Sequence, residues 1–212
     1  MRITNAFRRL LQAYGTETAK RRLWDKEFAQ GRWKNLDFTP DDCVYGLIAK
    51  YANRESILDL GCGSGNTGNE LPADAYGDYT GIDISEVALE KARQRSEKNA
   101  RGEKNRFFPC DVASYHPKKK FDVILFRETI YYVPRSRIRS MLERYSAFLK
   151  RNGVFIVRLW DGRKHYRRIV ELIESKFHVV EKFSPQESDV MVLVFRSRSQ
   201  EQGEGERISF ES

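Results

Sequence analysis

The sequence is poor in cysteine and proline, and it lacks any long apolar run. It has three cysteines and six prolines among 212 residues. Cys43, Cys62 and Cys110 are too few and too scattered for a disulfide framework or a zinc site, which favours a reducing, cytoplasmic compartment. No apolar stretch reaches the length of about 18 residues that a membrane-spanning helix needs, so we expect no transmembrane helix.

The N-terminus also lacks the apolar block of a secretory signal. Residues 1–9 could form a short amphipathic helix that touches a membrane, but a helix packed on its own domain is the favoured interpretation. The formal net charge is +8, and the excess is clustered. Such clusters are usually solvated faces, yet they make an anionic small-molecule acceptor or a nucleic acid more plausible than a cationic partner. They contain Lys118–Lys120, Arg135, Arg137 and Arg139, and Arg163, Lys164, Arg167 and Arg168.

Three stretches differ in pattern. Residues 1–50 read mainly as helix and predict an N-terminal helical cap. Residues 51–196 alternate between strands and helices, and the polar residues 197–212 predict a disordered tail. The expected strands are 56–60, 78–83, 105–110, 121–126, 153–160, 177–184 and 189–196. The expected helices are 66–71, 85–101, 135–149 and 162–176. Ser85 suits a helix N-cap, and Asn152-Gly153 predicts a helix end before a strand.

This alternation predicts an α/β fold, a Rossmann-like three-layer sandwich whose mostly parallel sheet has helices on both faces. The last two strands have no room for a helix between them. They therefore predict an antiparallel hairpin at one edge of the sheet.

Residues 57–65 read Ile-Leu-Asp-Leu-Gly-Cys-Gly-Ser-Gly, an apolar strand that runs into a glycine loop. Such a loop lets a nucleotide-like ligand approach the backbone closely, because glycine has no Cβ. The dinucleotide pattern wants glycine at position 66, where Asn66 stands, and no Gly-Lys-Ser/Thr follows. A phosphate-cradling P-loop is therefore excluded.

Three carboxylates follow successive strands: Asp59, Asp83 and Asp111. Ligands of open α/β sheets bind at these carboxyl ends. Asp83 stands about twenty residues after the loop, where a carboxylate can accept both ribose hydroxyls. Asp111 can accept a hydrogen bond from an adenine amino group. Loop or capping roles are the alternative for each, but together these residues favour an adenosine without a pyrophosphate.

At this point the chain resembles the class I S-adenosylmethionine-dependent methyltransferases. Residues 57–65 are similar to their first motif, 79–85 (Tyr-Thr-Gly-Ile-Asp-Ile-Ser) to the second, 121–126 to the fourth, and 149–157 to the motif around the fifth strand. The resemblance covers residues 40–196 and implies seven strands with the last antiparallel. It implies S-adenosylmethionine as cofactor and S-adenosylhomocysteine as product. The sequence contains no metal-ligand cluster, so we expect no metal. The cofactor-binding residues it implies are Asp59, Gly61, Gly63, Gly65, Asp83, Ile84, Asp111, Val112 and Arg127.

The segment after the fourth strand, Arg127-Glu128-Thr129-Ile130-Tyr131-Tyr132, usually faces the methyl group in this family. It lacks the Asp/Asn-Pro-Pro-Tyr of enzymes that methylate exocyclic amines of bases. The pattern is similar to that of small-molecule methyltransferases, including nodulation-type enzymes acting on sugar derivatives. Glu128 is the first candidate for a base or acceptor-orienting group, with a structural ion pair as the alternative. Tyr131 is a candidate for the pocket.

Two further features bear on the site. His165 follows the fifth strand and has a pKa range suited to proton transfer, although a lone histidine there is often structural. Trp24, Phe28 and Trp33 could form a lid over the cofactor or simply pack on the sheet. The sequence therefore predicts a methyltransferase acting on O or N of a small molecule, a sugar or glycan precursor being one candidate. The alternatives are an RNA or protein acceptor, and a non-catalytic binding protein.

Overall fold

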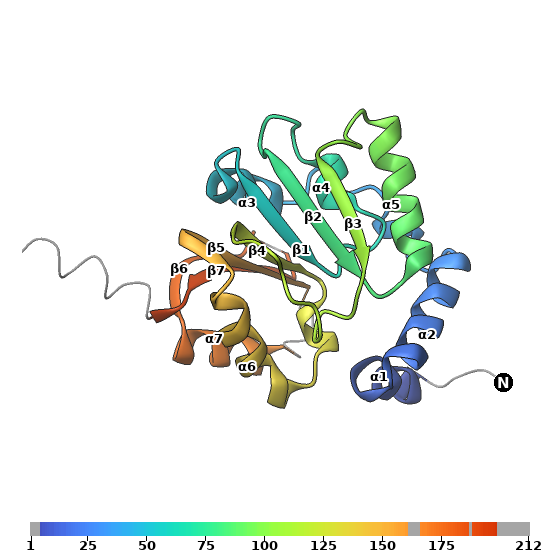
Figure 1. The fold of residues 1–212 in the computed structure, drawn as a ribbon. Helices are drawn as coiled ribbons and strands as arrows, with labels where there is room; N and C mark the ends of the chain where they lie inside the picture. Colours follow the sequence, from blue (N-terminus) through green and yellow to red (C-terminus); the bar gives the residue numbers. More distant parts are fainter. Residues whose placement is uncertain (1–4, 161–165, 187, 199–212) are drawn as a thin grey trace, which may run out of the picture.

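The computed structural model contains one seven-stranded sheet between two layers of helices (Figure 1), and it describes residues 5–160, 166–186 and 188–198. The strands are β1 Ser56–Leu60, β2 Asp78–Asp83, β3 Asn105–Pro109, β4 Phe121–Arg127, β5 Leu149–Trp160, β6 His178–Phe183 and β7 Val190–Arg196. They are ordered β3-β2-β1-β4-β5-β7-β6. Strands β1 to β5 pair in parallel, and β7 is antiparallel to both β5 and β6.

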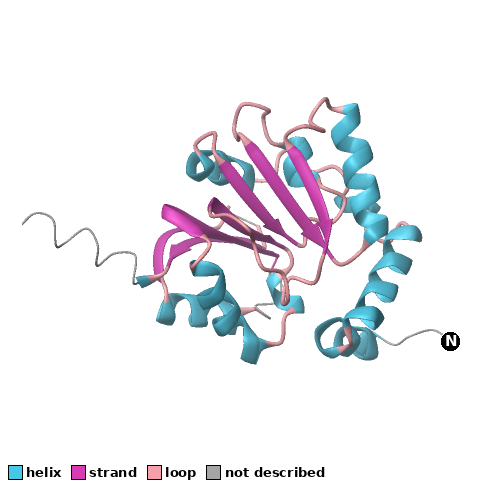
Figure 2. Ribbon diagram, in the orientation of Figure 1, coloured by secondary structure: helices cyan, strands magenta, loops and turns pink. Residues whose placement is uncertain are grey.

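The predicted fold class is confirmed in both its parallel core and its antiparallel edge, which Figure 2 shows as one continuous magenta layer. In β1 and β4 the run of apolar residues is buried on both faces, as parallel strands require. The strand order changes direction at β1 and β4. Their carboxyl ends therefore flank the crevice where open α/β sheets bind ligands.

Helices cover both faces of the sheet. They are α3 Val44–Ala52, α4 Asn66–Glu70, α5 Glu86–Lys98, α6 Arg135–Ser146 and α7 Arg167–Lys176, with a short 3₁₀ helix, η2, at Ile130–Tyr132. One hydrophobic core joins α6 and α7 to the sheet through Leu142 and Ile173. A second core joins α3 and α5 to the opposite face through Ile48 and Leu89. In the part of the chain that is described, no helix is long and apolar enough to cross a bilayer.

The N-terminal segment forms α1 Asn5–Tyr14, α2 Glu17–Ala29 and the 3₁₀ helix η1 Lys34–Leu36. Helix α2 is attached to the start of α5. The Asp25 Oδ1 atom accepts hydrogen bonds from Ser85 Oγ at 2.7 Å and from the Val87 amide at 3.3 Å. Ser85 is itself the N-cap of α5, as predicted, since its Oγ accepts from the Ala88 amide. The Ser85 hydroxyl thus both caps α5 and joins α2 to it.

One boundary prediction is wrong. Asn152 and Gly153 do not end a helix: α6 stops at Ser146, and both residues lie within β5. The reason is an irregularity in the β4–β5 pairing, where Phe121 pairs with Leu149 but Val123 pairs with Val154. The four residues 150–153 of β5 therefore stand against the single Asp122 of β4, which interrupts the ladder without ending the strand. The expected helix over 162–176 begins at Arg167; residues 161–165 and most of the predicted tail lie outside the described residues.

Candidate functional site

A cavity of about 540 Å³ opens at the carboxyl ends of β1, β2, β4 and β5. Its floor is the glycine loop, and its walls come from the segments after β2, β3 and β4. Helices α1 and α2 and the segment around η1 supply the remaining wall. The lining residues from the N-terminal segment are Gln12, Lys20, Trp24, Phe28, Trp33, Leu36, Thr39 and Asp42.

The glycine loop is shaped by left-handed backbone conformations. Gly61 has φ of 82°, and a Cβ there would lie 2.2 Å from the Cγ2 atom of Thr129. Its missing side chain thus makes room for the segment after β4. Gly63 has φ of 54°, and the nearest atom to a Cβ would be in the Phe28 ring at 3.6 Å. The loop therefore leaves its backbone open toward the cavity mainly at Gly63.

Asp83 holds the loop and faces the cavity. Its Oδ2 atom accepts from the Gly63 amide at 2.9 Å, and its Oδ1 atom accepts from the Ser85 amide at 2.8 Å. Burial raises the pKa of Asp83 to about 6, although these amides favour the charged form. Each carboxylate oxygen retains acceptor capacity after one hydrogen bond, so Asp83 can still receive hydroxyl donors from a ligand.

Two other carboxylates at the strand ends have protein partners. Asp111 accepts a hydrogen bond from Lys20 Nζ of α2 at 2.9 Å, and its Oδ1 atom accepts from the Ala113 amide. Asp59 is buried within β1 and accepts from the Tyr79 hydroxyl at 2.6 Å. Burial raises the pKa of Asp59. The ion pair of Lys20 with Asp111 means that α2 reaches the edge of the cavity where an adenine edge is expected.

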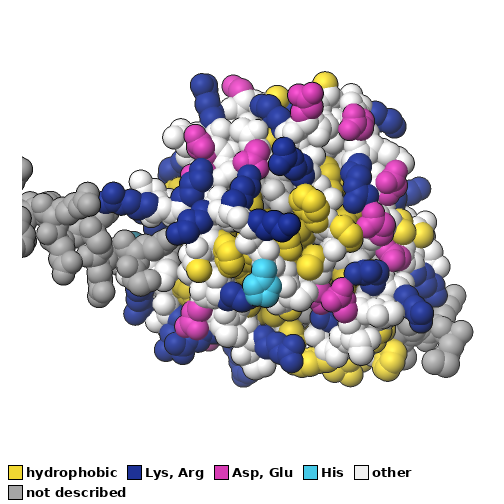
Figure 3. All heavy atoms as spheres, in the orientation of Figure 1, with side chains coloured by type: hydrophobic (Ala, Val, Ile, Leu, Met, Phe, Trp, Pro, Cys, Tyr) yellow, Lys and Arg dark blue, Asp and Glu magenta, His cyan; other side chains and the backbone are white. Residues whose placement is uncertain are grey.

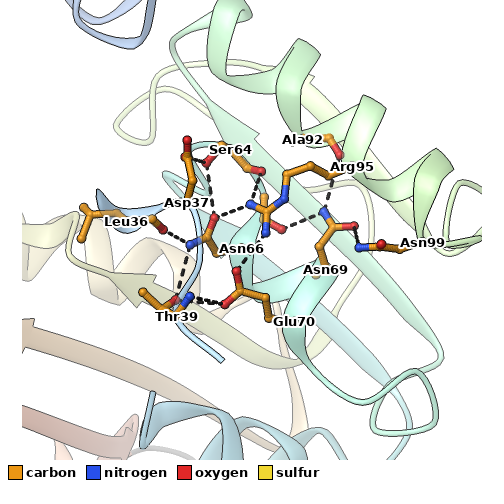
Figure 4. A network of polar contacts seen from close by, with 12 residues as sticks. Leu36, Asp37, Thr39, Ser64, Asn66, Asn69, Glu70, Ala92, Arg95 and Asn99 are labelled. Carbon is orange, nitrogen blue, oxygen red and sulfur yellow. Dashed lines mark hydrogen bonds and ion pairs between the residues drawn. The ribbon is translucent and has the colours of Figure 1, made fainter. Parts of the chain in front are cut away.

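A polar network fastens the segment after η1 to the glycine loop (Figure 4). Ser64 Oγ donates to Asp37 at 2.6 Å, and Asn66 Nδ2 donates to the Leu36 carbonyl. Arg95 of α5 donates to the Ser64 carbonyl and to Asn66 Oδ1. Asn66, which departs from the dinucleotide pattern, therefore has a structural use: its amide joins the loop, η1 and α5 at one point.

The part of the cavity wall that follows β4 is built around Glu128. This residue has φ of 59°, an uncommon left-handed conformation for a side chain of its size. Its Oε1 atom forms an ion pair with Arg158 of β5, and its Oε2 atom accepts from the Tyr131 hydroxyl at 2.6 Å. Burial, reinforced by the Glu128 charge, raises the pKa of Tyr131. Tyr131 therefore stays protonated and acts as a hydrogen-bond donor.

Asp42, just before α3, joins two arginines from neighbouring strands. Arg127 Nη2 lies 2.7 Å from Asp42 Oδ2, and Arg158 Nε lies 3.2 Å from the same atom. Burial alone would raise the pKa of Asp42, but the two guanidinium groups lower it below its usual value. Arg127 also donates to Thr39 Oγ1 at 2.7 Å. The arginine predicted to bind cofactor is thus already held by the N-terminal segment.

Aromatic side chains of α2 form the wall above the glycine loop. Trp24 contacts Phe28 and Trp33 with ring centroids 6.3 and 5.7 Å apart, and it meets Tyr132 edge-on at 4.9 Å. All four rings line the cavity. The tryptophans therefore lie over the site, as the lid hypothesis expects, rather than packing on the sheet away from it.

The structure brings most of the predicted site residues together at one cavity. The residues that line it are Asp59, Gly61, Gly63, Asp83, Ile84, Asp111, Val112, Arg127, Glu128 and Tyr131. Gly65 does not line it; this residue is the N-cap of α4, and Ala92 lies 2.7 Å from where its Cβ would be. His165 lies outside the described residues. Among the residues that are described, no group of three His, Cys, Asp or Glu side chains is arranged to hold a metal ion.

Sequence reasoning missed Gln12, Lys20 and Asp42. Each comes from the N-terminal segment, far from the motifs, and each meets its partners only through the tertiary fold. The sequence contains only indirect signals for two of these residues. Asp42 stands at the start of a helix and Lys20 on a basic stretch, neither of which points to a site.

Comparisons with known proteins agree with this geometry. Residues 57–153 match the family model described as a methyltransferase domain. Among curated proteins, the mRNA cap guanine-N(7) methyltransferase of Schizosaccharomyces pombe is 32% identical over 126 residues, which cover 52% of this chain and 34% of that protein. The 27-O-demethylrifamycin SV methyltransferase of Amycolatopsis mediterranei is 26% identical over 119 residues, covering 53% of this chain and 44% of that protein.

The chain spans only a part of such relatives, for example 23% of a Cryptococcus neoformans mRNA cap guanine-N(7) methyltransferase. Solved structures match over more of their length. The N-methyltransferase NodS from Bradyrhizobium japonicum, in complex with S-adenosylhomocysteine, has a TM-score of 0.66 at 17% identity, covering 84% of this chain and 98% of that one. The 1,6-didemethyltoxoflavin-N1-methyltransferase of Burkholderia thailandensis has a TM-score of 0.69 at 18% identity, covering 84% of this chain and 86% of that one.

The strand order and the solved structures show a Rossmann-like methyltransferase fold, and residues 57–153 match a methyltransferase-domain model. Both findings agree with the resemblance to class I S-adenosylmethionine-dependent methyltransferases.

Proposed function

We propose that this chain transfers a methyl group from S-adenosylmethionine to an oxygen or nitrogen of a small molecule. The observation that carries the proposal is one cavity that is lined by both the glycine loop and Glu128 and is walled by α1 and α2. Its volume of about 540 Å³ lies in the range of small-molecule sites. A cofactor and a modest acceptor fit such a space better than a polymer does.

The cofactor half would be held by the glycine loop and the strand-end carboxylates. Asp83 would accept the ribose hydroxyls, because its two oxygens already face the cavity beside Gly63. Ile84 would lie against the adenine face, and Asp111 and Val112 against its edge. The Gly63 backbone and the Phe28 ring leave room for the methionine portion. When bound, S-adenosylmethionine supplies an electrophilic methyl group on a sulfonium.

The acceptor half would be oriented by Glu128 and Tyr131. Their hydrogen bond and the Glu128–Arg158 ion pair fix the carboxylate, which can accept the N–H or O–H of an acceptor and turn its lone pair toward the methyl group. Since the leaving group is already activated, alignment and exclusion of water are the main tasks of the protein. The aromatic wall of Trp24, Phe28 and Tyr132 supports the second task.

The test begins with calorimetry of the wild-type chain with S-adenosylhomocysteine, followed by a radiolabelled methyl-transfer screen over sugar nucleotides, small amines and carboxylic acids. We expect cofactor binding and label transfer to at least one small acceptor class. Absence of cofactor binding would overturn the proposal as a whole. Binding with transfer to none of these acceptors would overturn its substrate class.

A second candidate, an RNA acceptor, is favoured by one observation: several curated relatives are mRNA cap guanine-N(7) methyltransferases. The basic sequence, with a pI near 9.4, is compatible with it. A cap dinucleotide and capped RNA therefore belong in the same screen. Label transfer to the cap, with RNA affinity that falls steeply as salt rises, would favour this candidate over the first.

A further inference from the structure

Helix α1 exposes apolar residues and buries a polar one, which is the reverse of the usual arrangement of an amphipathic helix. Phe7, Leu10 and Tyr14 follow one another at the spacing of a single helical face, yet they are 54%, 59% and 69% exposed. On the other side of the helix, the polar Gln12 is only 2% exposed. A helix that binds to its own domain normally buries its apolar side.

Contacts on the polar face explain why the helix cannot simply turn over. Arg8 forms an ion pair with Glu27 of α2 at 3.3 Å, and Glu27 also accepts from the Trp33 indole at 3.2 Å. Gln12, four residues after Arg8, lines the cavity. The polar face is therefore committed to α2 and to the site, which leaves the face with Leu10 and Tyr14 directed outward.

The charge of α1 indicates what this outward face meets. The helix, NAFRRLLQAY, has two arginines and no acidic residue. Arg9 is exposed and forms no ion pair with a described residue. Figure 3 shows hydrophobic side chains along the lower right edge of the molecule, where Figure 1 places α1, with Lys and Arg side chains close by. The whole chain carries a net charge of +8.

We propose that the outward face of α1, which carries Leu10 and Tyr14, binds reversibly to an anionic membrane surface. Aromatic and leucine side chains flanked by arginine are the composition of interfacial helices, which lie in the headgroup region and bind better to anionic lipids. A second copy of the chain is a poorer occupant, because two such faces would bring the exposed Arg9 side chains of the two copies, which have like charge, close together. In this arrangement one side of α1 touches lipid and the other side walls the cavity.

The experiment is flotation of the full chain with vesicles of phosphatidylcholine alone or mixed with phosphatidylglycerol. We expect the wild type to float with the mixed vesicles at low salt and to be released at high salt. The double variant Leu10→Ser/Tyr14→Ser should bind the mixed vesicles at least about tenfold more weakly, because the two apolar side chains that would be buried in the lipid are gone. Arg9→Gln should bind several-fold more weakly.

Phe183→Ser is the matched control. Phe183 is a partly exposed aromatic residue, as Tyr14 is, but it lies on β6 at the edge of the sheet. It should float as the wild type does. Circular dichroism melts establish that all variants fold, which is expected because the altered side chains are exposed. Wild-type protein that does not float, or a double variant that floats equally well, would overturn the proposal. So would a dimer, seen by sedimentation, that the double variant dissociates.

Discussion

The two halves of the cavity are built in different ways. At the half proposed for the cofactor, backbone atoms of one short loop meet carboxylates from the ends of neighbouring strands, and Asp83 accepts from the loop itself. At the half proposed for the acceptor, side chains from distant parts of the chain line the cavity: Gln12, Asp42, Glu128 and Arg158. The first half depends on the local course of the backbone, whereas the second depends on tertiary packing.

This difference suggests that substitutions in the two halves have different effects. A ligand shared by a whole family can be met by backbone geometry that a glycine pattern encodes. An acceptor that varies from one enzyme to the next is met by side chains that can be exchanged without altering the sheet. Substitutions in one half are therefore expected to affect one substrate and leave the other unchanged.

The largest effect is expected from Glu128→Gln. The substitution keeps the shape of the side chain but removes the charge that pairs with Arg158, and it weakens the hydrogen bond that the Tyr131 hydroxyl donates. We expect turnover to fall by about 10²-fold or more, the range for removal of a positioned proton-accepting group, with cofactor affinity unchanged. Single-turnover kinetics and calorimetry measure the two. Glu143→Gln, an exposed carboxylate on α6, is the control. A parallel loss of cofactor binding would contradict the independence of the two halves.

Asp83→Ala addresses the cofactor half. Removing a carboxylate that can receive two ligand hydroxyls is expected to weaken S-adenosylhomocysteine binding by about 10²-fold, from one to two charged hydrogen bonds. Because Asp83 also holds the Gly63 and Ser85 amides, Asp83→Asn is needed beside it. Calorimetry that shows equal affinity in wild type and Asp83→Ala would remove Asp83 from the site.

The raised pKa of Asp83 predicts a pH dependence with opposite signs for stability and binding. Its pKa is about 6 in the folded protein against an ordinary value of 3.8. Between these values the folded state holds more protons than the unfolded state, so the free energy of unfolding falls as pH rises, by up to about 3 kcal/mol. Cofactor affinity instead rises with pH through about 6, since the carboxylate receives the hydroxyls. Denaturation and calorimetry from pH 4 to 8 check both slopes, which Asp83→Asn should flatten.

Gln12 gives the smallest and most selective effect. Both polar atoms of its amide are buried without a hydrogen-bond partner among the described residues, a state that costs about 1–3 kcal/mol. We expect Gln12→Leu to raise the free energy of unfolding by about 1 kcal/mol while raising the KM for the acceptor about tenfold. Thermal melts and steady-state kinetics measure these. Improved stability with an unchanged KM would show that the amide serves no ligand.

The residues proposed to bind the cofactor could be predicted to lie together because their signals are local. The apolar run of β1, the glycines, and Asp83 at a strand end mark it within about thirty residues, and the strand pattern of β2 was predicted to the residue. Of the residues proposed to meet the acceptor, only Glu128 and Tyr131 could be predicted from the sequence. Asp42 carries no local signal, because its meaning comes from Arg127 and Arg158, which are 85 and 116 residues away. The irregular start of β5 was missed for a related reason, since Asn152-Gly153 looks like a helix end unless the pairing with β4 is known.

The hydrogen bonds from Ser64 and Asn66 to Asp37 and Leu36 have a consequence for how the protein fluctuates. The segment after η1 and the glycine loop cannot open separately, because either movement breaks the same bonds. We expect the two to form one cooperative unit in native-state hydrogen exchange, with amides near Thr39 and Asn69 sharing an opening free energy. Deleting the N-terminal helices would then lower the protection of the glycine-loop amides against hydrogen exchange. The boundary predicted near residue 50, between the helical cap and the rest of the chain, would then not separate two independently opening units.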